Sequence, residues 1–385
     1  MNKITISPIG DILQFQRGYD LPSEYRTEGE YPVISSAGFS GTHNEYKVGG
    51  ENVVTGRYGT IGKIYYYDGK CWPLNTSLYV KDFKGNLPKY IYYLLQYALN
   101  VDGKDKSTVP GVNRNVLHML EVPYYKDHLY QEMIIRPLEA IDKKIALNKR
   151  IAAELEAMIK TIYDYWFVQF DFPDIDGKSY RSSGGEMVLD KQLKRKIPKG
   201  WECIPLNKRF AFERGVEVGA KNYSNINKNG FVPYYRVSDV GSQSDTYVDP
   251  KLLNNKLLKF EDVCVTFDGT VGKVDFGLVG GYSTGLRKIF DLEGAINNAV
   301  IYSIFKSDYA QIVINKYATG SNILHASESI NHLYIAFNKR IYDKFQDVIS
   351  PLFDKMLAMK KENLKLAAIR DWLLPILMNG QAVVQ

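Results

Sequence analysis

The sequence contains few of the residues that mark a secreted or zinc-binding protein. It has three cysteines in 385 residues, Cys71, Cys203 and Cys264, and they are widely separated. An odd number of scattered cysteines forms neither a disulfide framework nor a zinc pattern, and free thiols are typical of a reducing compartment. The cysteine content therefore argues against a disulfide-stabilised extracellular protein.

Long apolar runs are also missing. No stretch approaches the ~18 consecutive apolar residues of a membrane span, and residues 1–10 lack the basic and apolar regions of a secretory signal. We therefore expect a cytoplasmic chain with no membrane partner.

Recognisable catalytic motifs are absent as well. The glycine-rich stretch 56–63 resembles a phosphate-binding loop, but Arg57 occupies the first glycine position and Ile64 replaces the required serine or threonine. The five histidines form no metal-ligand or nucleophile pattern. Neither a dinucleotide-binding glycine motif nor the Asn-Pro-Pro-Tyr type of sequence used by amino-methylating enzymes is present. We therefore predict no catalytic residue, no metal site and no cofactor site in this chain, while an enzyme with an unrecognised site remains an alternative.

The net charge of +6 is not concentrated in any tail or block. This distribution is compatible with an anionic partner such as nucleic acid. A basic groove would have to be assembled by folding, so charge alone does not demonstrate one.

An internal repeat organises the chain. Residues 51–64 (ENVVTGRYGTIGKI) recur as residues 261–274 (EDVCVTFDGTVGKV), and Gln-Arg-Gly at 16–18 corresponds to Glu-Arg-Gly at 213–215. Similarity at a fixed offset indicates a tandem duplication. We predict an α+β protein in which each copy is a strand-rich domain followed by a long helix.

Apolar residues spaced alternately by three and four positions predict both helices. The first series is Ile134, Leu138, Ile141, Ile145, Asn148, Ala152, Leu155, Ile159, Ile162 and Trp166. The second is Ile349, Leu352, Met356, Met359, Asn363 and Leu366, continuing less regularly through Ile369, Leu373 and Leu377. Each contains one asparagine, a residue that sets register in coiled coils.

Such a heptad pattern favours packing between the two helices. About 35 helical residues extend ~50 Å, further than a domain of this size covers. We predict an antiparallel coiled-coil pair with internal pseudo-two-fold symmetry and the two domains at opposite ends. The alternative is that each helix packs on its own domain.

These patterns divide the chain into five segments. The turn formers between the first helix and the second domain, and the lack of apolar periodicity there, predict a linker. The segments are a first domain at 1–130, a central helix at 131–169, the linker at 170–200, a second domain at 201–342 and a C-terminal helix at 343–380.

The repeated Gly-Thr-x-Gly-Lys motif is the main candidate for contacting nucleic acid. Its exposed amides, hydroxyl and ammonium group are suited to a phosphate oxygen, although a plain hairpin turn with a solvated lysine is an equal alternative. Neighbouring cations and two polar loops could complete a DNA-binding face, although ordinary loops look the same. The candidate residues in the first domain are Arg57, Gly59, Thr60, Lys63, Thr108, Asn113 and Arg114. Those in the second are Gly269, Thr270, Lys273, Arg287, Lys288, Ser321 and Asn322.

The whole chain resembles the specificity subunit of type I restriction-modification systems. The segments that carry the resemblance are the two helices, PL...ID at 137–142, YWFVQF at 165–170, SSGGE at 182–186, IPKGWE at 197–202 and RDWLLPILMNGQ at 370–381. The resemblance implies two mixed α/β target recognition domains, separated by a pair of long antiparallel coiled-coil helices. Each domain would read one half of an interrupted, asymmetric site in double-stranded DNA, and the helices would set the distance between the halves.

The resemblance also implies partners for a non-catalytic subunit. Two methyltransferase subunits would supply S-adenosylmethionine chemistry on adenine, and restriction subunits that use ATP and magnesium can join the assembly. Tyr163, Tyr165 and Phe167 are candidates for the docking face, with packing against the domain as the alternative. The rival functions are a stand-alone DNA-modifying enzyme and a coiled-coil protein adaptor.

Overall fold

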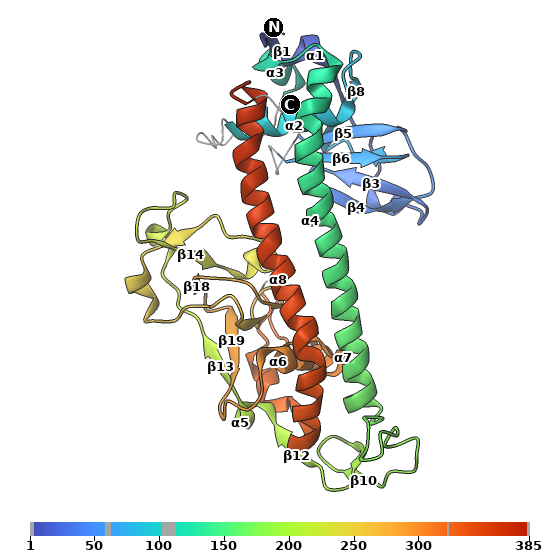
Figure 1. Ribbon diagram of the computed structural model, residues 1–385, viewed down its shortest axis with the longest axis vertical. Helices are drawn as coiled ribbons and strands as arrows, with labels where there is room; N and C mark the ends of the chain where they lie inside the picture. The colour runs from blue at the N-terminus through green and yellow to red at the C-terminus, as the bar shows by residue number, and fades with distance from the viewer. Residues whose placement is uncertain (1–3, 58–62, 102–112, 322, 383–385) are drawn as a thin grey trace. The chain divides into compact units, whose positions relative to one another are not determined.

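The computed structural model describes residues 4–57, 63–101, 113–321 and 323–382. The chain forms two compact units: unit 1 spans residues 1–145 and 364–385, and unit 2 spans residues 146–363. Two long helices, α4 (His128–Tyr163) and α8 (Lys339–Met378), each contribute to both units (Figure 1).

Unit 1 combines short strands with helices at its two sequence ends. Its strands are β1 (Thr5–Pro8), β2 (Gln14–Arg17), β3 (Tyr31–Ser35), β4 (Gly38–His43), β5 (Glu51–Gly56), β6 (Ile64–Asp68), β7 (Trp72–Pro73), β8 (Ser77–Asp82) and β9 (Glu121–Tyr124). Besides the long helices, it contains α1 (Ile9–Ile12), the 3-10 turn η1 (Ser23–Tyr25), α2 (Pro88–Val101) and α3 (Arg114–Met119).

Unit 2 contains the same kinds of element in the same order, after an additional hairpin. Its strands are β10 (Met187–Asp190), β11 (Arg195–Pro198), β12 (Glu202–Pro205), β13 (Phe210–Arg214), β14 (Val232–Tyr235), β15 (Tyr247–Val248), β16 (Val263–Thr266), β17 (Val274–Asp275), β18 (Gly281–Tyr282), β19 (Leu286–Asp291) and β20 (Tyr334–Phe337). Its shorter helices are α5 (Leu206–Arg209), α6 (Asn298–Lys306) and α7 (Asp308–Lys316). A π-helical turn, η2 (Asp164–Val168), continues α4, and 3-10 turns are η3 (Ala220–Asn222), η4 (Val237–Asp239), η5 (Pro250–Leu253) and η6 (Ser327–His332).

Strand order confirms the predicted duplication. The four-stranded sheet has the order β2-β8-β5-β6 in unit 1 and β13-β19-β16-β17 in unit 2. The three-stranded sheets, β4-β3-β7 and β15-β14-β18, each contain one parallel pair, β3 with β7 and β14 with β18. The two-stranded sheets β1-β9 and β12-β20 also correspond. The repeated segments 51–64 and 261–274 therefore contain the equivalent strands β5 and β16 and end at the first residues of β6 and β17.

A close backbone approach explains why the Arg-Gly pair recurs before the small sheet. A Cβ on Gly18 would lie 2.2 Å from the carbonyl oxygen of Leu74, and a Cβ on Gly215 would lie 2.1 Å from that of Tyr282. Both distances are far inside van der Waals contact, so only glycine allows the chain to cross here.

Each long helix is fastened to its unit by a glutamine. The side-chain oxygen of Gln131 on α4 accepts a hydrogen bond of 3.0 Å from the amide of Leu87, the residue before α2. Gln346 on α8 accepts one of 2.9 Å from the amide of Asn297, the residue before α6. Amides at helix starts lack partners within the helix, so each glutamine satisfies a group that needs one.

The cores lie between the four-stranded sheets and the helices that cover them. In unit 1, α2 packs against β5 and β6, and in unit 2, α6 packs against β16, β17 and β19. Ile91 and Leu94 are fully buried on α2, as is Phe305 on α6. Burying each such side chain contributes about 1.5–3 kcal/mol to folding.

The two long helices pair antiparallel within each unit, which confirms that prediction (Figure 1). In unit 2, Asn148 is hydrogen-bonded to Asn363 at 3.0 Å, and the rings of Tyr163 and Phe345 lie 6.0 Å apart. The partner residue number thus falls as the number along α4 rises, so the helices run in opposite directions. In unit 1, Arg370 forms a 2.9 Å ion pair with Asp142. The antiparallel direction therefore follows from contacts inside each unit.

The end of the second heptad series differs from the prediction. Ile369 is 49% exposed, whereas Leu377 is buried as predicted, together with Leu374 and Met378. The adjacent Arg370 bonds to Asp142, so a charged side chain takes the place of Ile369 in the helix contact. The helices also begin earlier than predicted, at His128 and Lys339.

The segment 170–200, predicted as a linker, is an ordered connection. Phe170, Phe172 and Ile197 are buried in the core of unit 2, and β10 and β11 form an antiparallel hairpin. The carboxylate of Asp171 accepts bonds of 2.7 Å from both the amide and the hydroxyl of Ser182, which lowers the pKa of Asp171. The turn formers in this segment shape a packed connection.

None of the helices in the described part of the chain combines the length and the apolar character that a membrane crossing requires.

Candidate nucleic-acid interface

The second Gly-Thr-x-Gly-Lys motif is the turn that joins β16 to β17. The amide of Gly272 donates to the carbonyl oxygen of Thr266 at 2.8 Å, and the Thr266 amide donates to that of Lys273 at 2.9 Å. Gly269 and Gly272 have φ angles of 69° and 81°, which favour glycine. The hairpin turn is therefore present, and Thr270 and Lys273 are exposed on it.

A second loop is bonded to this turn. The amide of Gly269 donates to the carbonyl oxygen of Leu324 at 2.8 Å, and the amide of Ala326 donates to that of Phe267 at 2.7 Å. The imidazole of His325 lies 2.7 Å from the carboxylate of Asp268. We call the turn 267–273 and the loop 317–326 together the unit 2 loop face; it brings Gly269, Thr270 and Lys273 into one surface with the loop that carries Ser321. Asn322 lies outside the described residues.

Arg287 and Lys288 do not belong to the exposed part of this face, which corrects the sequence prediction. Arg287 is 6% exposed and donates to the carbonyl oxygen of Thr284 and, at 3.0 Å, to the hydroxyl of Ser327. Lys288 forms a 2.8 Å ion pair with Asp262. Both residues lie on β19, an inner strand of the four-stranded sheet, where neighbouring segments cover them. Arg287 thus holds Ser327, the first residue of η6, by a hydrogen bond.

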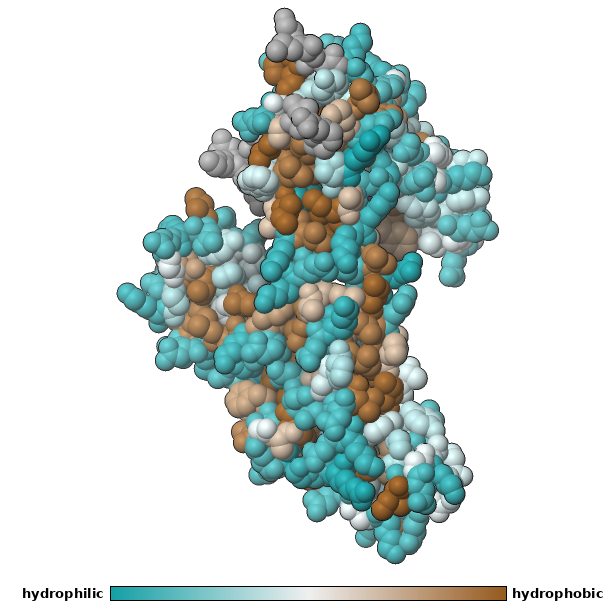
Figure 2. All heavy atoms as spheres, viewed as in Figure 1, coloured by the Kyte–Doolittle hydropathy of each residue, from teal (hydrophilic) through white to brown (hydrophobic). Residues whose placement is uncertain are grey.

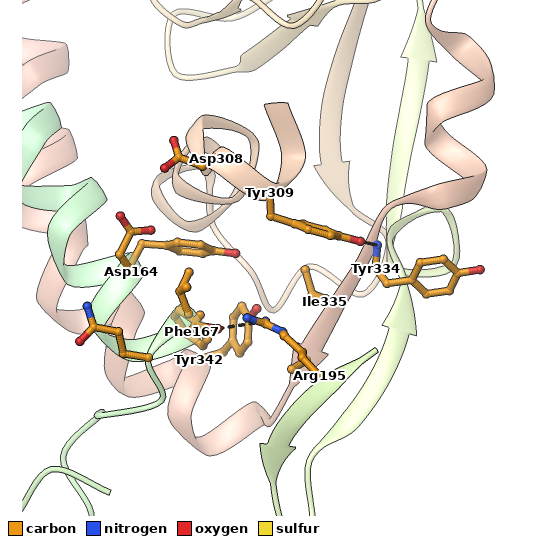
Figure 3. Close-up of a pocket in the computed structure, with 12 residues that line it drawn as sticks. Asp164, Phe167, Arg195, Asp308, Tyr309, Tyr334, Ile335 and Tyr342 are labelled. Carbon is orange, nitrogen blue, oxygen red and sulfur yellow. Dashed lines mark hydrogen bonds between the residues drawn. The ribbon is translucent and has the colours of Figure 1, made fainter. Parts of the chain in front are cut away.

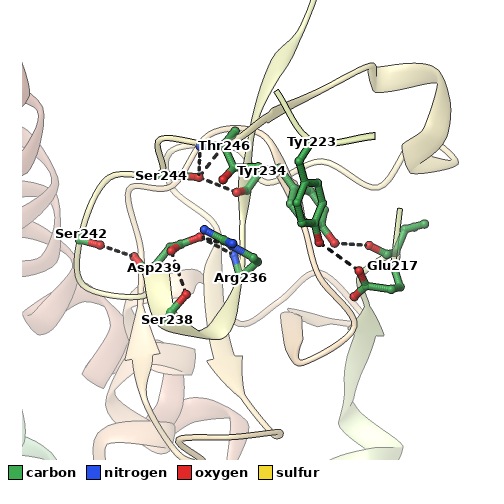
Figure 4. Close-up of polar contacts among 10 residues, drawn as sticks. Glu217, Tyr223, Tyr234, Arg236, Ser238, Asp239, Ser242, Ser244 and Thr246 are labelled. Atoms are coloured by element: carbon green, nitrogen blue, oxygen red, sulfur yellow. Dashed lines mark hydrogen bonds and ion pairs between the residues drawn. The ribbon is translucent and has the colours of Figure 1, made fainter. Parts of the chain in front are cut away.

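Hydrogen bonds within the segment that follows β14 hold its shape (Figure 4). The carboxylate of Asp239 accepts bonds from the Arg236 amide at 2.9 Å and from the Ser238 hydroxyl at 3.0 Å. Val237 lies against the turn, because a Cβ on Gly269 would be 3.4 Å from one of its methyl groups. The segment after β14 therefore contacts the turn.

In unit 1 the described part of the equivalent turn begins with Arg57 and resumes at Lys63. The Arg57 amide donates to the carbonyl oxygen of Thr76 at 2.9 Å, and Lys63 is exposed at the start of β6. The Thr55 hydroxyl donates to the Lys63 carbonyl oxygen at 3.1 Å, so the backbone of Lys63 is held against β5. Gly59, Thr60 and Thr108 lie outside the described residues.

Asn113 and Arg114 mark the beginning of α3. The side chain of Asn113 accepts a 2.9 Å bond from the amide of Asn115 and so caps the helix, while Arg114 is exposed in its first turn. On the same helix, His118 accepts a 3.0 Å bond from the amide of Phe15. Burial, with Arg114 and Lys84 nearby, lowers the pKa of His118 and favours the neutral ring that this bond requires.

The structure adds aromatic and cationic pairs that the sequence analysis did not single out. In unit 1 the ammonium group of Lys70 lies 4.5 Å from the ring centre of Tyr46, and that of Lys47 lies 4.5 Å from Trp72. In unit 2 the guanidinium of Arg236 lies 5.7 Å from Tyr223. These pairs flank the small sheets of both units. The abundance of tyrosine was the available signal, but which rings meet a cation depends on residues distant in sequence.

Two of the three aromatic residues proposed for docking are buried. The ring of Phe167 lies 4.8 Å from that of Phe345 and 4.5 Å from that of Tyr342, and Tyr163 packs beside it. Only Tyr165 remains substantially exposed, with its hydroxyl 2.5 Å from that of Ser179. Tyr163 and Phe167 therefore serve to pack the end of α4 and the π-helical turn against the core of unit 2.

Within the part of the chain that the structure describes, histidine, cysteine and acidic residues do not form a cluster suited to a metal ion. The cysteines are free, and burial raises the pKa of the Cys71 thiol to about 12. Neither observation identifies a reactive centre.

Residues 1–157 match the family model described as the type I restriction modification DNA specificity domain. The chain is 24% identical over 336 residues to the type I restriction enzyme MjaIX specificity subunit of Methanocaldococcus jannaschii, covering 81% of this chain and 74% of the relative. It is 21% identical over 363 residues to the HindI specificity subunit of Haemophilus influenzae, with 77% of each chain covered. Residues 1–157 thus match a type I DNA specificity domain, and most of the chain is similar to type I specificity subunits.

The fold agrees with that similarity. A crystal structure of the type I restriction-modification S subunit from M. genitalium superimposes with a TM-score of 0.51 at 16% identity, over 98% of this chain and 97% of that one. The predicted α+β class with two domains and two long helices is therefore confirmed. The predicted specificity role is supported as well, since the matched domain is described as a DNA specificity domain and both relatives as specificity subunits.

Proposed function

We propose that each unit of this specificity subunit reads one half of a bipartite, asymmetric site in double-stranded DNA. The observation that carries the proposal is the duplicated framework of the two units. Strand orders and the Gly18 and Gly215 crossings are the same, whereas the surface loops differ in sequence. A shared framework with different loops is suited to reading two different half-sites in equivalent ways.

Phosphate contacts and base contacts would come from different parts of each surface. Lys63 and Lys273 are exposed at equivalent positions of the repeat and would contact the DNA backbone. The loop 317–326 is a candidate for reaching base edges in unit 2. The His325–Asp268 pair holds it, and Arg287 bonds to Ser327, the residue that follows it.

The long helices are proposed to set the distance between half-sites and to hold two methyltransferase subunits. Half-sites read from one face of DNA lie about one turn, ~34 Å, apart. Apolar side chains appear among hydrophilic ones on the face drawn in Figure 2. The exposed apolar residues of the long helices include Leu147 and Met158 on α4 and Trp372 on α8. Exposed apolar side chains of this kind are suited to partner subunits.

In this proposal the chain itself binds no cofactor. S-adenosylmethionine would belong to the methyltransferase subunits, and ATP and magnesium to restriction subunits where these join. The complex would act in the cytoplasm, where it meets the chromosome.

Reconstitution with methyltransferase subunits of a type I system tests the proposal. Mobility shifts and methylation mapping should reveal an interrupted site with two different halves. A continuous or symmetric site would contradict it. Methylation or cleavage by the isolated chain would favour a stand-alone enzyme, and partner binding without salt-dependent DNA affinity would favour a protein adaptor.

A further inference from the structure

Unit 2 contains a cavity of about 270 Å³ where the π-helical end of α4 meets β11, β20 and the start of α8 (Figure 3). It lies apart from the unit 2 loop face, with which it shares no residue. Residues from η2, β11, the start of α7, β20 and α8 line it, and these include Phe167, Arg195, Tyr309, Ile335, Ala336 and Tyr342.

Arg195 is held in place at this cavity. Its guanidinium donates a 3.1 Å hydrogen bond to the carbonyl oxygen of Phe167 and lies 4.9 Å from the ring centre of Phe170. One bond to a carbonyl leaves further guanidinium donors for another group. Arg195 belongs to the hairpin β10–β11, which has no equivalent among the described strands of unit 1.

The hydroxyl of Tyr342 supplies a second donor from within the wall. Tyr342 is 3% exposed, and its hydroxyl has no hydrogen-bond partner among the described residues. Burial raises the pKa of Tyr342 well above its ordinary value, so the group stays protonated, and the charge of Arg195 acts on it. A buried hydroxyl without a partner is costly, and a ligand that accepts its hydrogen removes that cost.

The other polar groups at the cavity already have partners. The carboxylates of Asp164 and Asp308 bind the ammonium group of Lys160 at 2.9 and 3.0 Å. The hydroxyl of Tyr309 accepts a 3.2 Å bond from the amide of Tyr334. Arg195 supplies the positive charge at the cavity, and the Tyr342 hydroxyl is a buried donor there without a partner among the described residues.

We propose that this cavity binds a single carboxylate carried on a short aliphatic chain. Arg195 and Tyr342 would hold the two oxygens, since a guanidinium fork matches a carboxylate. Phe167, Ile335 and Ala336 provide apolar contact for the aliphatic part. Asp164 and Asp308 at the same cavity disfavour a multiply charged group such as phosphate. The carboxylate could come from a free small molecule or from a glutamate side chain of a protein partner.

Calorimetric titration of the full chain with butyrate tests this site. Butyrate should bind the wild-type chain, and Tyr342→Phe and Arg195→Gln should each weaken binding about tenfold or more, because each removes a hydrogen bond to a charged group. Tyr165→Phe is the matched control, because it removes an exposed hydroxyl from the same π-helical turn outside the cavity; its affinity should be unchanged. Tyr342→Phe keeps the buried ring, and thermal unfolding will verify that it folds.

The outcomes are distinguishable. Equal butyrate affinity in wild type and Tyr342→Phe, no butyrate binding at all, or phosphate binding as tight as butyrate would overturn the proposal. Tighter binding of the blocked peptide acetyl-Ala-Glu-Ala-amide than of butyrate would identify a protein side chain as the source. Tighter binding of butyrate would identify a free carboxylate. The DNA-reading role does not depend on this result.

Discussion

Glycine positions explain how two copies with different surfaces keep the same backbone. Gly18 and Gly215 stand at equivalent chain crossings, and in both a carbonyl oxygen occupies the space that a Cβ would need. Their recurrence was visible in the sequence as part of a repeated Arg-Gly pair. The reason for it was not, because the carbonyl groups come from residues about 60 positions further along, Leu74 and Tyr282.

Gly18→Ala should therefore lower the unfolding free energy of unit 1 by about 1–3 kcal/mol, the usual cost of overpacking. Gly49→Ala is the matched control, since its Cβ would lie 3.7 Å from a lysine side chain, an ordinary contact. Hydrogen exchange of the β2 and β8 amides will measure both. Equal protection in the two variants would show that the crossing tolerates a side chain.

His118 should make unit 1 sensitive to acid. The pKa of His118 is lowered in the folded state by burial, so between that pKa and the unfolded value of about 6.5 only the unfolded chain is protonated. Stability should then be fully present above pH 6.5 and decrease as the pH falls through the folded pKa. His118→Gln should flatten this part of the pH profile. The exposed His128→Gln serves as control, and a wild-type profile that stays flat below pH 6.5 would contradict the assignment.

Lys273→Ala should weaken DNA binding of the reconstituted complex at all sequences. One lost phosphate contact lowers the slope of log affinity against log salt by about one. Lys251→Ala, an exposed lysine on η5, is the control for loss of one positive charge. If the two variants have the same slope, Lys273 is a solvated turn residue, as the alternative reading of the motif holds.

Arg287 shows a limit of prediction at this scale. In the sequence, Arg-Lys at 287–288 resembles part of a basic surface. In the structure, β19 lies between β13 and β16, and Arg287 is bonded to Ser327 of η6. Whether a cation on a strand is exposed depends on segments that pack from elsewhere in the chain.

At the scale of elements, the helices were the most predictable part of the fold. A heptad pattern repeated over many turns identified both, and the paired asparagines Asn148 and Asn363 meet as such a pattern implies. The packed structure of segment 170–200 was not predictable from the sequence. It depends on a few aromatic residues, among them Phe170 and Phe172, that pack into the core of unit 2, and not on a periodic pattern.

The asparagine pair gives a prediction for the helix contact. Asn148 is 1% exposed and donates to Asn363 at 3.0 Å and to Glu362 at 2.7 Å. Asn148→Leu should lower the unfolding free energy of unit 2 by about 1 kcal/mol, because it leaves the half-buried amide oxygen of Asn363 without this donor. The double variant Asn148→Leu/Asn363→Leu should recover most of that loss. Chemical denaturation will measure the cycle, and additive losses would show that the two amides do not interact.

At the scale of the whole molecule, duplication is the organising fact. The duplication was detectable in the sequence because both copies retain the turn glycines and the heptad pattern. The matching strand orders of the two units confirm it. The surfaces that differ between the copies carry the proposed specificity. Their base-reading residues were not predictable, since loops such as 317–326 have no pattern beyond polarity.

The most direct test of two independent half-site readers is methylation mapping with an altered unit 2 loop face. Ser321→Ala combined with Thr270→Ala changes exposed positions of that face and leaves unit 1 untouched. Long-read detection of modified adenine should show relaxed sequence preference in one half of the site, with the other half and the spacing unchanged. Relaxation of both halves, or a change in spacing, would contradict the account.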